Sequence, residues 1–102
     1  MLIPFQKTLQ KKVTFQGVGL HSGLKTEVSV LPATENHGII FKRTDLNKNN
    51  TIKANFENVS SAILCTTLKN KFEVKVTTVE HLLAALYITG IDNALIEVSN
   101  SE

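Results

Sequence analysis

The sequence has a single cysteine, no tryptophan and no strong excess of charge of either sign. One cysteine cannot form an internal disulfide, which favours a reducing compartment. Eleven Lys and Arg against nine Asp and Glu give a net charge of +2, too weak and too dispersed for a nucleic-acid-binding face. The chain also has no apolar run of the roughly 20 residues that a membrane-spanning helix needs, and its N-terminus has no signal-peptide pattern. We therefore expect a cytoplasmic protein without a membrane span and without a nucleic-acid partner.

The residues that are present suit one small globular domain with mostly strand structure. The chain has 102 residues, of which 42% are hydrophobic, and a chain of this size buries roughly two-thirds of its unfolded surface. Polar and apolar residues alternate along 12–16 and 25–31, as they do in half-buried strands. We predict strands there, further strands at 38–42 and 94–98, which follow turn-like residues, and a hairpin over 66–76 with Phe72, Val74 and Val76 on one face.

The period changes to that of a helix between Thr78 and Ile88. The inward positions fall at helical spacing and are occupied by Val79, Leu82, Leu83 and Leu86. Gly90 is placed to end the helix in the left-handed conformation. The pattern predicts an α+β fold, a two-layer domain in which a mostly antiparallel sheet packs against one main helix. Because this helix is apolar on most sides, a further covering layer is expected, and its uncovered face predicts self-association.

The stretch GVGLHSG, residues 17–23, has the glycine content of a nucleotide-binding loop but not its spacing. Its spacing is G-x-G-x-x-x-G rather than G-x-G-x-x-G, and a strand follows where a dinucleotide site needs the N-terminus of a helix. We therefore interpret the glycines as permitting a sharp turn between strands. His21 at this turn is either a surface residue or a group that approaches a ligand closely.

Two other reactive residues have simpler interpretations. His37 lies in an Asn-His-Gly sequence, which is typical of a turn. Nothing in the sequence around Cys65 would activate a thiol, so a small buried residue is the preferred interpretation.

Glu80 and His81 stand side by side at the start of the predicted helix. Thr77 and Glu80 fit a capping box, which would explain Glu80 structurally. His81 lies between Val79 and Leu82, where a buried imidazole needs a partner to offset its desolvation. A helix N-terminus favours an ionised carboxylate and a neutral imidazole, the pair that a catalytic zinc site uses as general base and ligand.

A catalytic zinc ion takes three protein ligands, and the sequence offers no second ligand at short helical spacing from His81. A closed site of His21, Cys65 and His81 is conceivable, but these residues lie far apart in the chain. Either the protein holds no metal, or the remaining ligands lie outside these residues.

Several segments together resemble one protein family. They are GVGLHSG (17–23), FKRTDL (41–46), LCTTL (64–68), TTVEHLLAAL (77–86) and GIDNALIEV (90–98). In order and spacing they are similar to the zinc-dependent UDP-3-O-acyl-N-acetylglucosamine deacetylases of lipid A biosynthesis in Gram-negative bacteria. The resemblance implies a protein about three times as long, with two similarly folded α+β halves whose helix layers pack against each other. Residues 1–102 would then be an incomplete N-terminal domain without the second catalytic domain.

The resemblance also implies roles for individual residues. His81 matches the family's first zinc ligand and Glu80 its general base. His21 matches a histidine near the active site, and Leu64 and Cys65 match a loop that lines the substrate cleft. The two remaining zinc ligands, a His and an Asp, belong to the second half, so zinc is expected to be absent from this chain alone.

The implied reaction is hydrolysis of the 2-acetamido group of UDP-3-O-acyl-N-acetylglucosamine, the committed step of lipid A synthesis, with release of acetate. This chain is not expected to catalyse it alone. The alternative function is a non-catalytic α+β module that binds a nucleotide sugar or a protein, with Glu80 serving only as a helix cap.

Overall fold

The computed structural model describes residues 5–18, 23–55, 58–61, 66–77 and 79–101. Its elements in chain order are β1 (Val13–Val18), β2 (Lys25–Pro32), β3 (Ile39–Arg43), β4 (Thr51–Lys53), β5 (Val59–Ser61), β6 (Thr67–Lys69), β7 (Lys75–Thr77), α1 (Glu80–Thr89) and β8 (Ala94–Val98). The predicted α+β class is confirmed, as are the four separate strands and the hairpin. Within the described ranges, no helix has the length and apolarity that crossing a membrane requires.

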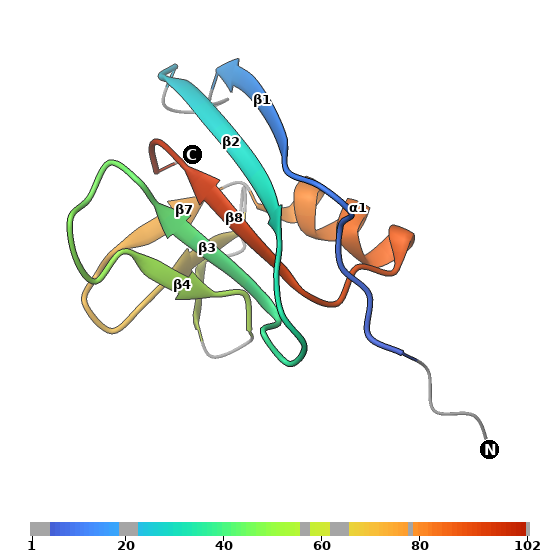
Figure 1. The fold of residues 1–102 in the computed structure, drawn as a ribbon. Helices are drawn as coiled ribbons and strands as arrows, with labels where there is room; N and C mark the ends of the chain where they lie inside the picture. The colour runs from blue at the N-terminus through green and yellow to red at the C-terminus, as the bar shows by residue number, and fades with distance from the viewer. Residues whose placement is uncertain (1–4, 19–22, 56–57, 62–65, 78, 102) are drawn as a thin grey trace.

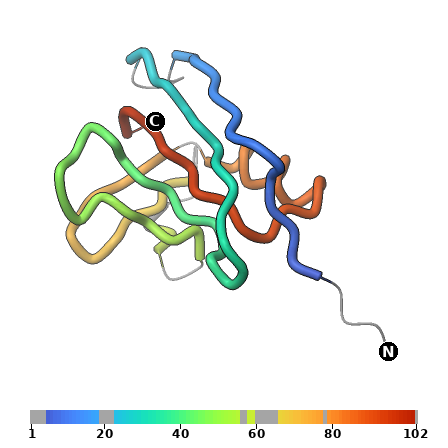
Figure 2. The backbone as a smooth tube through the Cα atoms, in the orientation of Figure 1, coloured from blue at the N-terminus to red at the C-terminus, as the bar shows by residue number. Residues whose placement is uncertain are grey.

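The main sheet has five strands in the order β1-β2-β8-β3-β4 (Figure 1). Neighbouring strands are antiparallel except β3 and β8, which run parallel. The last strand of the chain therefore lies in the middle of the sheet, between strands that precede it by more than fifty residues (Figure 2). A central strand such as β8 has a neighbouring strand along each edge. Every second residue of β8 is apolar and buried, so one side of the strand faces the core.

A second, smaller sheet consists of β5, β6 and β7. The hairpin of β6 and β7 was expected, but its separation from the main sheet was not. Leu68 and Val76 are cross-strand partners in this hairpin and both are 2% exposed. The prediction that Phe72 shares their face is wrong, because Phe72 lies in the turn between the two strands and is 52% exposed.

The core lies on one face of the main sheet. Phe41 and Val30 both stand opposite Ile96, one on each side of β8. The core also includes residues of α1 and of the small sheet, since Val79, Leu86, Leu68 and Val76 belong to the same buried cluster. Helix α1 and strand β7 accordingly lie on the same side of the main sheet (Figure 1). The other face carries polar side chains such as Thr14 and Ser29, whose hydroxyl groups are 2.9 Å apart.

Gly90 ends α1 as predicted, with a φ of 75°. The amide of Gly90 donates to the Tyr87 carbonyl at 3.1 Å, and the amide of Ile91 donates to the Leu86 carbonyl at 2.9 Å. This is the Schellman arrangement, which satisfies carbonyl groups at the end of the helix and favours glycine because of its positive φ. Leu86 is buried here and Ile91 packs against the core, so the helix end is fixed in position.

Candidate active site at the start of helix α1

Glu80 is the first residue of α1 and follows β7 after a two-residue connection. Its Oε2 accepts a hydrogen bond from the backbone amide of Thr66 at 3.1 Å. The amide of Val79 donates to the carbonyl of Thr66 at 3.4 Å, so the start of the helix is tied to the residue that precedes β6. The half-buried carboxylate of Glu80 is thereby held in one orientation by a backbone donor.

The capping-box interpretation of Thr77 and Glu80 is wrong. Val79 occupies the N-cap position and makes no side-chain cap hydrogen bond, while Thr77 belongs to β7 and pairs with Thr67. Glu80 is therefore the first residue of the helix rather than its third. Its carboxylate still lies in the first turn, where the helix dipole stabilises a negative charge.

His81 is exposed, which corrects the expectation that its imidazole would have to be desolvated. The neighbouring inward positions behave as predicted, with Val79 and Leu86 buried and Leu82 and Leu83 packed against the core. His81 is also among the residues that line an apolar cavity of about 370 Å³. The imidazole is accessible to a ligand while its backbone is held by a packed helix.

The cavity lies between the core face of the main sheet and the junction of β7 with α1. Its walls are almost entirely apolar, and His81 and Thr77 are the polar residues among those that line it; the others are Phe15, Val28, Phe41, Val76, Val79, Leu82 and Val98. Phe15 is 48% exposed at the open side, on the edge strand β1. The site thus combines an accessible imidazole with a concave apolar surface, a common composition for a small-molecule site.

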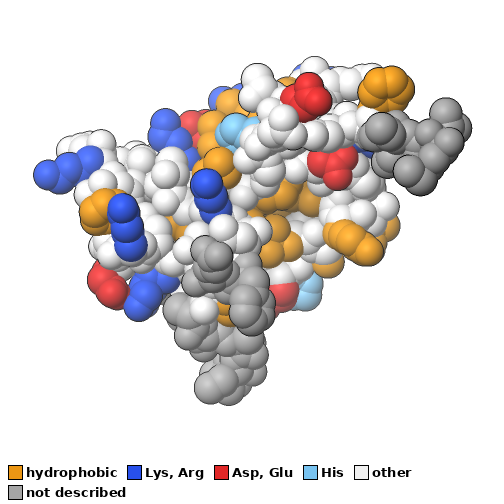
Figure 3. Space-filling view, turned by 90° about the horizontal axis from the view of Figure 1, so that it is seen from below, with side chains coloured by type: hydrophobic (Ala, Val, Ile, Leu, Met, Phe, Trp, Pro, Cys, Tyr) orange, Lys and Arg blue, Asp and Glu red, His pale blue; other side chains and the backbone are white. Residues whose placement is uncertain are grey.

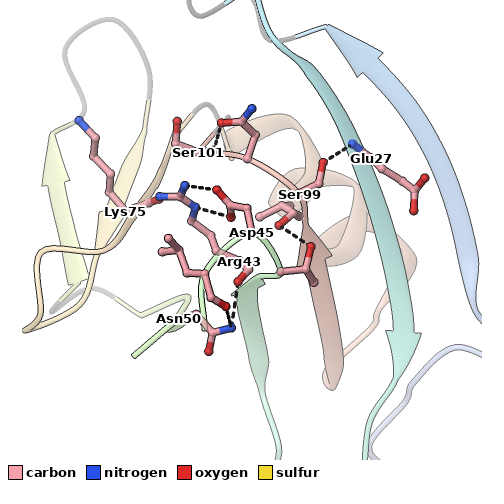
Figure 4. A network of polar contacts seen from close by, with 11 residues as sticks. Glu27, Arg43, Asp45, Asn50, Lys75, Ser99 and Ser101 are labelled. Atoms are coloured by element: carbon pink, nitrogen blue, oxygen red, sulfur yellow. Dashed lines mark hydrogen bonds and ion pairs between the residues drawn. The ribbon is translucent and has the colours of Figure 1, made fainter. Parts of the chain in front are cut away.

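A polar network fixes the strand that leads into this site (Figure 4). Arg43, whose side chain is 14% exposed, forms an ion pair with Asp45 and donates from Nη1 to the Lys75 carbonyl at 3.4 Å. At the other end of β7, the amide of Thr77 donates to the Ser101 carbonyl at 2.7 Å. Both ends of β7 are therefore tied to residues that flank the main sheet, which positions Glu80 and His81 relative to it.

Of the predicted site residues, the structure brings together Glu80 and His81. His21, Leu64 and Cys65 lie outside the described residues, so their predicted substrate contacts stay predictions. His37 lies in the turn between β2 and β3, where its Nδ1 is 3.0 Å from the Gly38 carbonyl, in agreement with the turn interpretation. In the part of the chain that the structure describes, no three His, Cys, Asp or Glu side chains are grouped closely enough to hold a metal ion.

Two parts of the site were not predicted. One partner of Glu80 is a backbone amide, which any residue type at position 66 would supply except proline. The apolar cavity combines residues from β1, β2, β3, β7, β8 and α1, and no local pattern connects residues so far apart in the chain.

Comparison with known proteins adds the family context. Residues 6–102 match the family model described as UDP-3-O-acyl N-acetylglycosamine deacetylase (LpxC). The chain is 49% identical over 98 residues to proteins named UDP-3-O-acyl-N-acetylglucosamine deacetylase from Shewanella sp. (strain ANA-3) and Shewanella baltica (strain OS155). These matches cover 96% of this chain and 32% of each relative. The chain thus spans about one third of the length of the curated relatives that it matches.

Proposed function

The chain belongs to the UDP-3-O-acyl N-acetylglycosamine deacetylase family, and from this premise we propose that it is the N-terminal domain of a zinc-dependent deacetylase. In this proposal it acts in the cytoplasm on UDP-3-O-acyl-N-acetylglucosamine, as a step of lipid A biosynthesis. Its catalytic contribution is the pair Glu80 and His81. The observation that supports this most is the local geometry, in which an anchored carboxylate precedes an exposed imidazole at the mouth of a cavity.

Glu80 is proposed as the general base. Its Oε2 is held by the Thr66 amide, so the carboxylate is oriented before any substrate binds. A helix N-terminus stabilises negative charge, so this position suits a carboxylate that accepts a proton from an attacking water. The proton would return to the amine that leaves when the acetamide bond breaks, and acetate would be the other product.

His81 is proposed as a zinc ligand. When bound, zinc would polarise the acetamide carbonyl and acidify a water. The exposed imidazole fits the role of one ligand, but the described residues provide no cluster of three that could hold the ion by themselves. The proposal is therefore a shared site, to which this domain contributes His81 and another part of the protein contributes two further ligands. His21, Leu64 and Cys65 are proposed to contact the substrate.

The proposal can be tested with a chimera in which this chain replaces the 98 residues that it matches in the Shewanella (strain ANA-3) relative. We expect the chimera to release acetate from UDP-3-O-acyl-N-acetylglucosamine, while the 102-residue chain alone does not. A chimera that unfolds cooperatively and retains zinc but shows no deacetylation would contradict the proposal and favour a non-catalytic binding module.

The outward face of α1 supports the expected self-association. Ala84, Ala85 and Ile88 lie on one side of the helix at helical spacing and are all exposed. The side chains of Ile88 and Tyr87 are 81% and 87% exposed, and apolar surface of this kind is normally covered by another protein layer.

We therefore expect the isolated chain to form dimers or larger oligomers through this face, and Ile88→Lys to shift it to the monomer. Light scattering over a range of protein concentrations measures the mass of the wild-type chain and of the Ile88→Lys variant. A monomeric wild-type chain at every concentration would contradict the expectation. Ile40→Lys on the opposite face of the main sheet is a matched control, and it should leave the association unchanged.

A further inference from the structure

Positive charge is concentrated at one end of the molecule. Residues 42–50 and 69–75 contain six of the eleven Lys and Arg but only two of the nine Asp and Glu. Their formal charge is +4, against −2 for the rest of the chain. Figure 3 shows Lys and Arg side chains gathered at the end formed by the β3–β4 and β6–β7 turns. The prediction that the positive charge is dispersed is therefore wrong at this end of the molecule, where the modest net charge of the whole chain conceals the asymmetry.

The two turns at this end, with the strand ends that flank them, form one fixed unit, which we name the basic tip and define as residues 42–50 and 69–75. Asn70 joins them, because its Nδ2 donates to the carbonyls of Asn49 at 2.8 Å and Thr51 at 3.0 Å. The Oδ1 of the same side chain accepts from the amides of Phe72 at 2.9 Å and Val74 at 3.2 Å. A single side chain therefore fixes the β6–β7 turn internally and attaches it to the neighbouring turn.

The basic tip presents an exposed aromatic ring among lysines. Phe72 is 52% exposed, and the Nζ of Lys71 lies 5.2 Å from the centre of its ring. Lys69 is paired with Glu73 at 2.8 Å. Lys48, Lys71 and Lys75 of the tip are exposed, and none of them forms an ion pair with another described residue. Exposed cations around an exposed ring are the composition of surfaces that bind at a lipid–water boundary.

We propose that the basic tip docks on the surface of an anionic lipid bilayer. Phe72 enters the boundary between headgroups and acyl chains, and Lys48, Lys71 and Lys75 interact with headgroup phosphates. A nucleic-acid strand fits this end less well, because stacking of successive bases needs several aromatic residues along a groove and the tip has one. The interaction is weak and reversible, since three free cations and one ring provide much less attraction than a lipid anchor. It is independent of the proposed deacetylase function.

Co-sedimentation of the 102-residue chain with vesicles tests the proposal. We expect binding to vesicles of phosphatidylglycerol and phosphatidylcholine, no binding to phosphatidylcholine alone, and loss of binding when NaCl rises from about 0.05 to about 0.5 M. Each lysine near an anionic surface contributes about fivefold in partitioning, so Lys48→Gln with Lys71→Gln should weaken binding roughly 25-fold. Phe72→Ser should also weaken it.

Matched control variants show whether vesicle binding depends on the basic tip or on any exposed lysine or aromatic ring. Lys11→Gln with Lys12→Gln removes the same charge elsewhere on the exposed surface, and Phe5→Ser removes a ring that is 91% exposed. Both should leave vesicle binding unchanged, with circular dichroism showing that every variant is folded. Equal binding to neutral vesicles, equal losses in control and tip variants, or tighter binding to a single-stranded RNA than to anionic vesicles would each overturn the proposal.

Discussion

Replacing Glu80 with Gln in the chimera is expected to lower kcat for deacetylation by roughly 100- to 10,000-fold, the contribution of a positioned general base. The glutamine side chain has the size of glutamate and keeps an oxygen that can accept from the backbone N–H of Thr66, which lies 3.1 Å from Oε2 of Glu80. A glutamine side chain, however, cannot take a proton from water. Steady-state kinetics of acetate release measure the effect, and thermal unfolding measures the accompanying change in stability.

The change in stability separates the catalytic role of Glu80 from a structural one. With the acceptor preserved, we expect a stability loss below about 1 kcal/mol, the typical value of one hydrogen bond. Glu97→Gln, on the polar face of the main sheet, is the matched control and should preserve kcat. An unchanged kcat in Glu80→Gln together with a measurable loss of stability would contradict the catalytic role and leave Glu80 as a structural residue of the helix start.

Replacing Phe41 with Ala is expected to have the largest effect on stability, a loss of about 3–5 kcal/mol in the free energy of unfolding. Phe41 is 1% exposed, and its cross-strand neighbours Ile52 and Ile96 are both fully buried. The alanine would leave a void in the centre of the core and enlarge the adjoining cavity, which Phe41 also lines. Since domains of this size are stable by only about 5–15 kcal/mol, much of the population should unfold under mild conditions.

Urea unfolding followed by circular dichroism measures this loss in the 102-residue chain. Phe5→Ala is the matched control, because the Phe5 side chain is 91% exposed and its removal should change the midpoint little. A similar small change for Phe41→Ala would contradict the core assignment and indicate that β3 does not pack as described.

The parts of the fold that local patterns determine could be predicted from the sequence. Alternation of polar and apolar residues indicated β1 and β2, and apolar segments after turn residues indicated β3 and β8. Helical spacing indicated which residues of α1 face the core. Gly90 marked the end of the helix, because a left-handed residue is required there. In each case the information lies within a few neighbouring residues.

The parts that depend on distant contacts could not be predicted. The parallel pairing of β3 with β8 joins residues more than fifty positions apart, and β4, with three residues, is too short to show alternation. His81 is flanked by apolar residues yet exposed, because the helix is uncovered on its outer side. The helix starts at Glu80 rather than at the position that a capping box requires, and the Glu80 carboxylate accepts from Thr66, in a segment that only the fold brings close.

The zinc content of the 102-residue chain and of the chimera after dialysis tests most directly whether this domain supplies one ligand to a shared site. The prediction is that the isolated chain retains little zinc, while the chimera retains stoichiometric zinc and loses it in His81→Ala. Stoichiometric zinc in the isolated chain would contradict a shared site and indicate a closed one built with His21 or Cys65. Unchanged zinc in the His81→Ala chimera would contradict the role of His81 as a ligand.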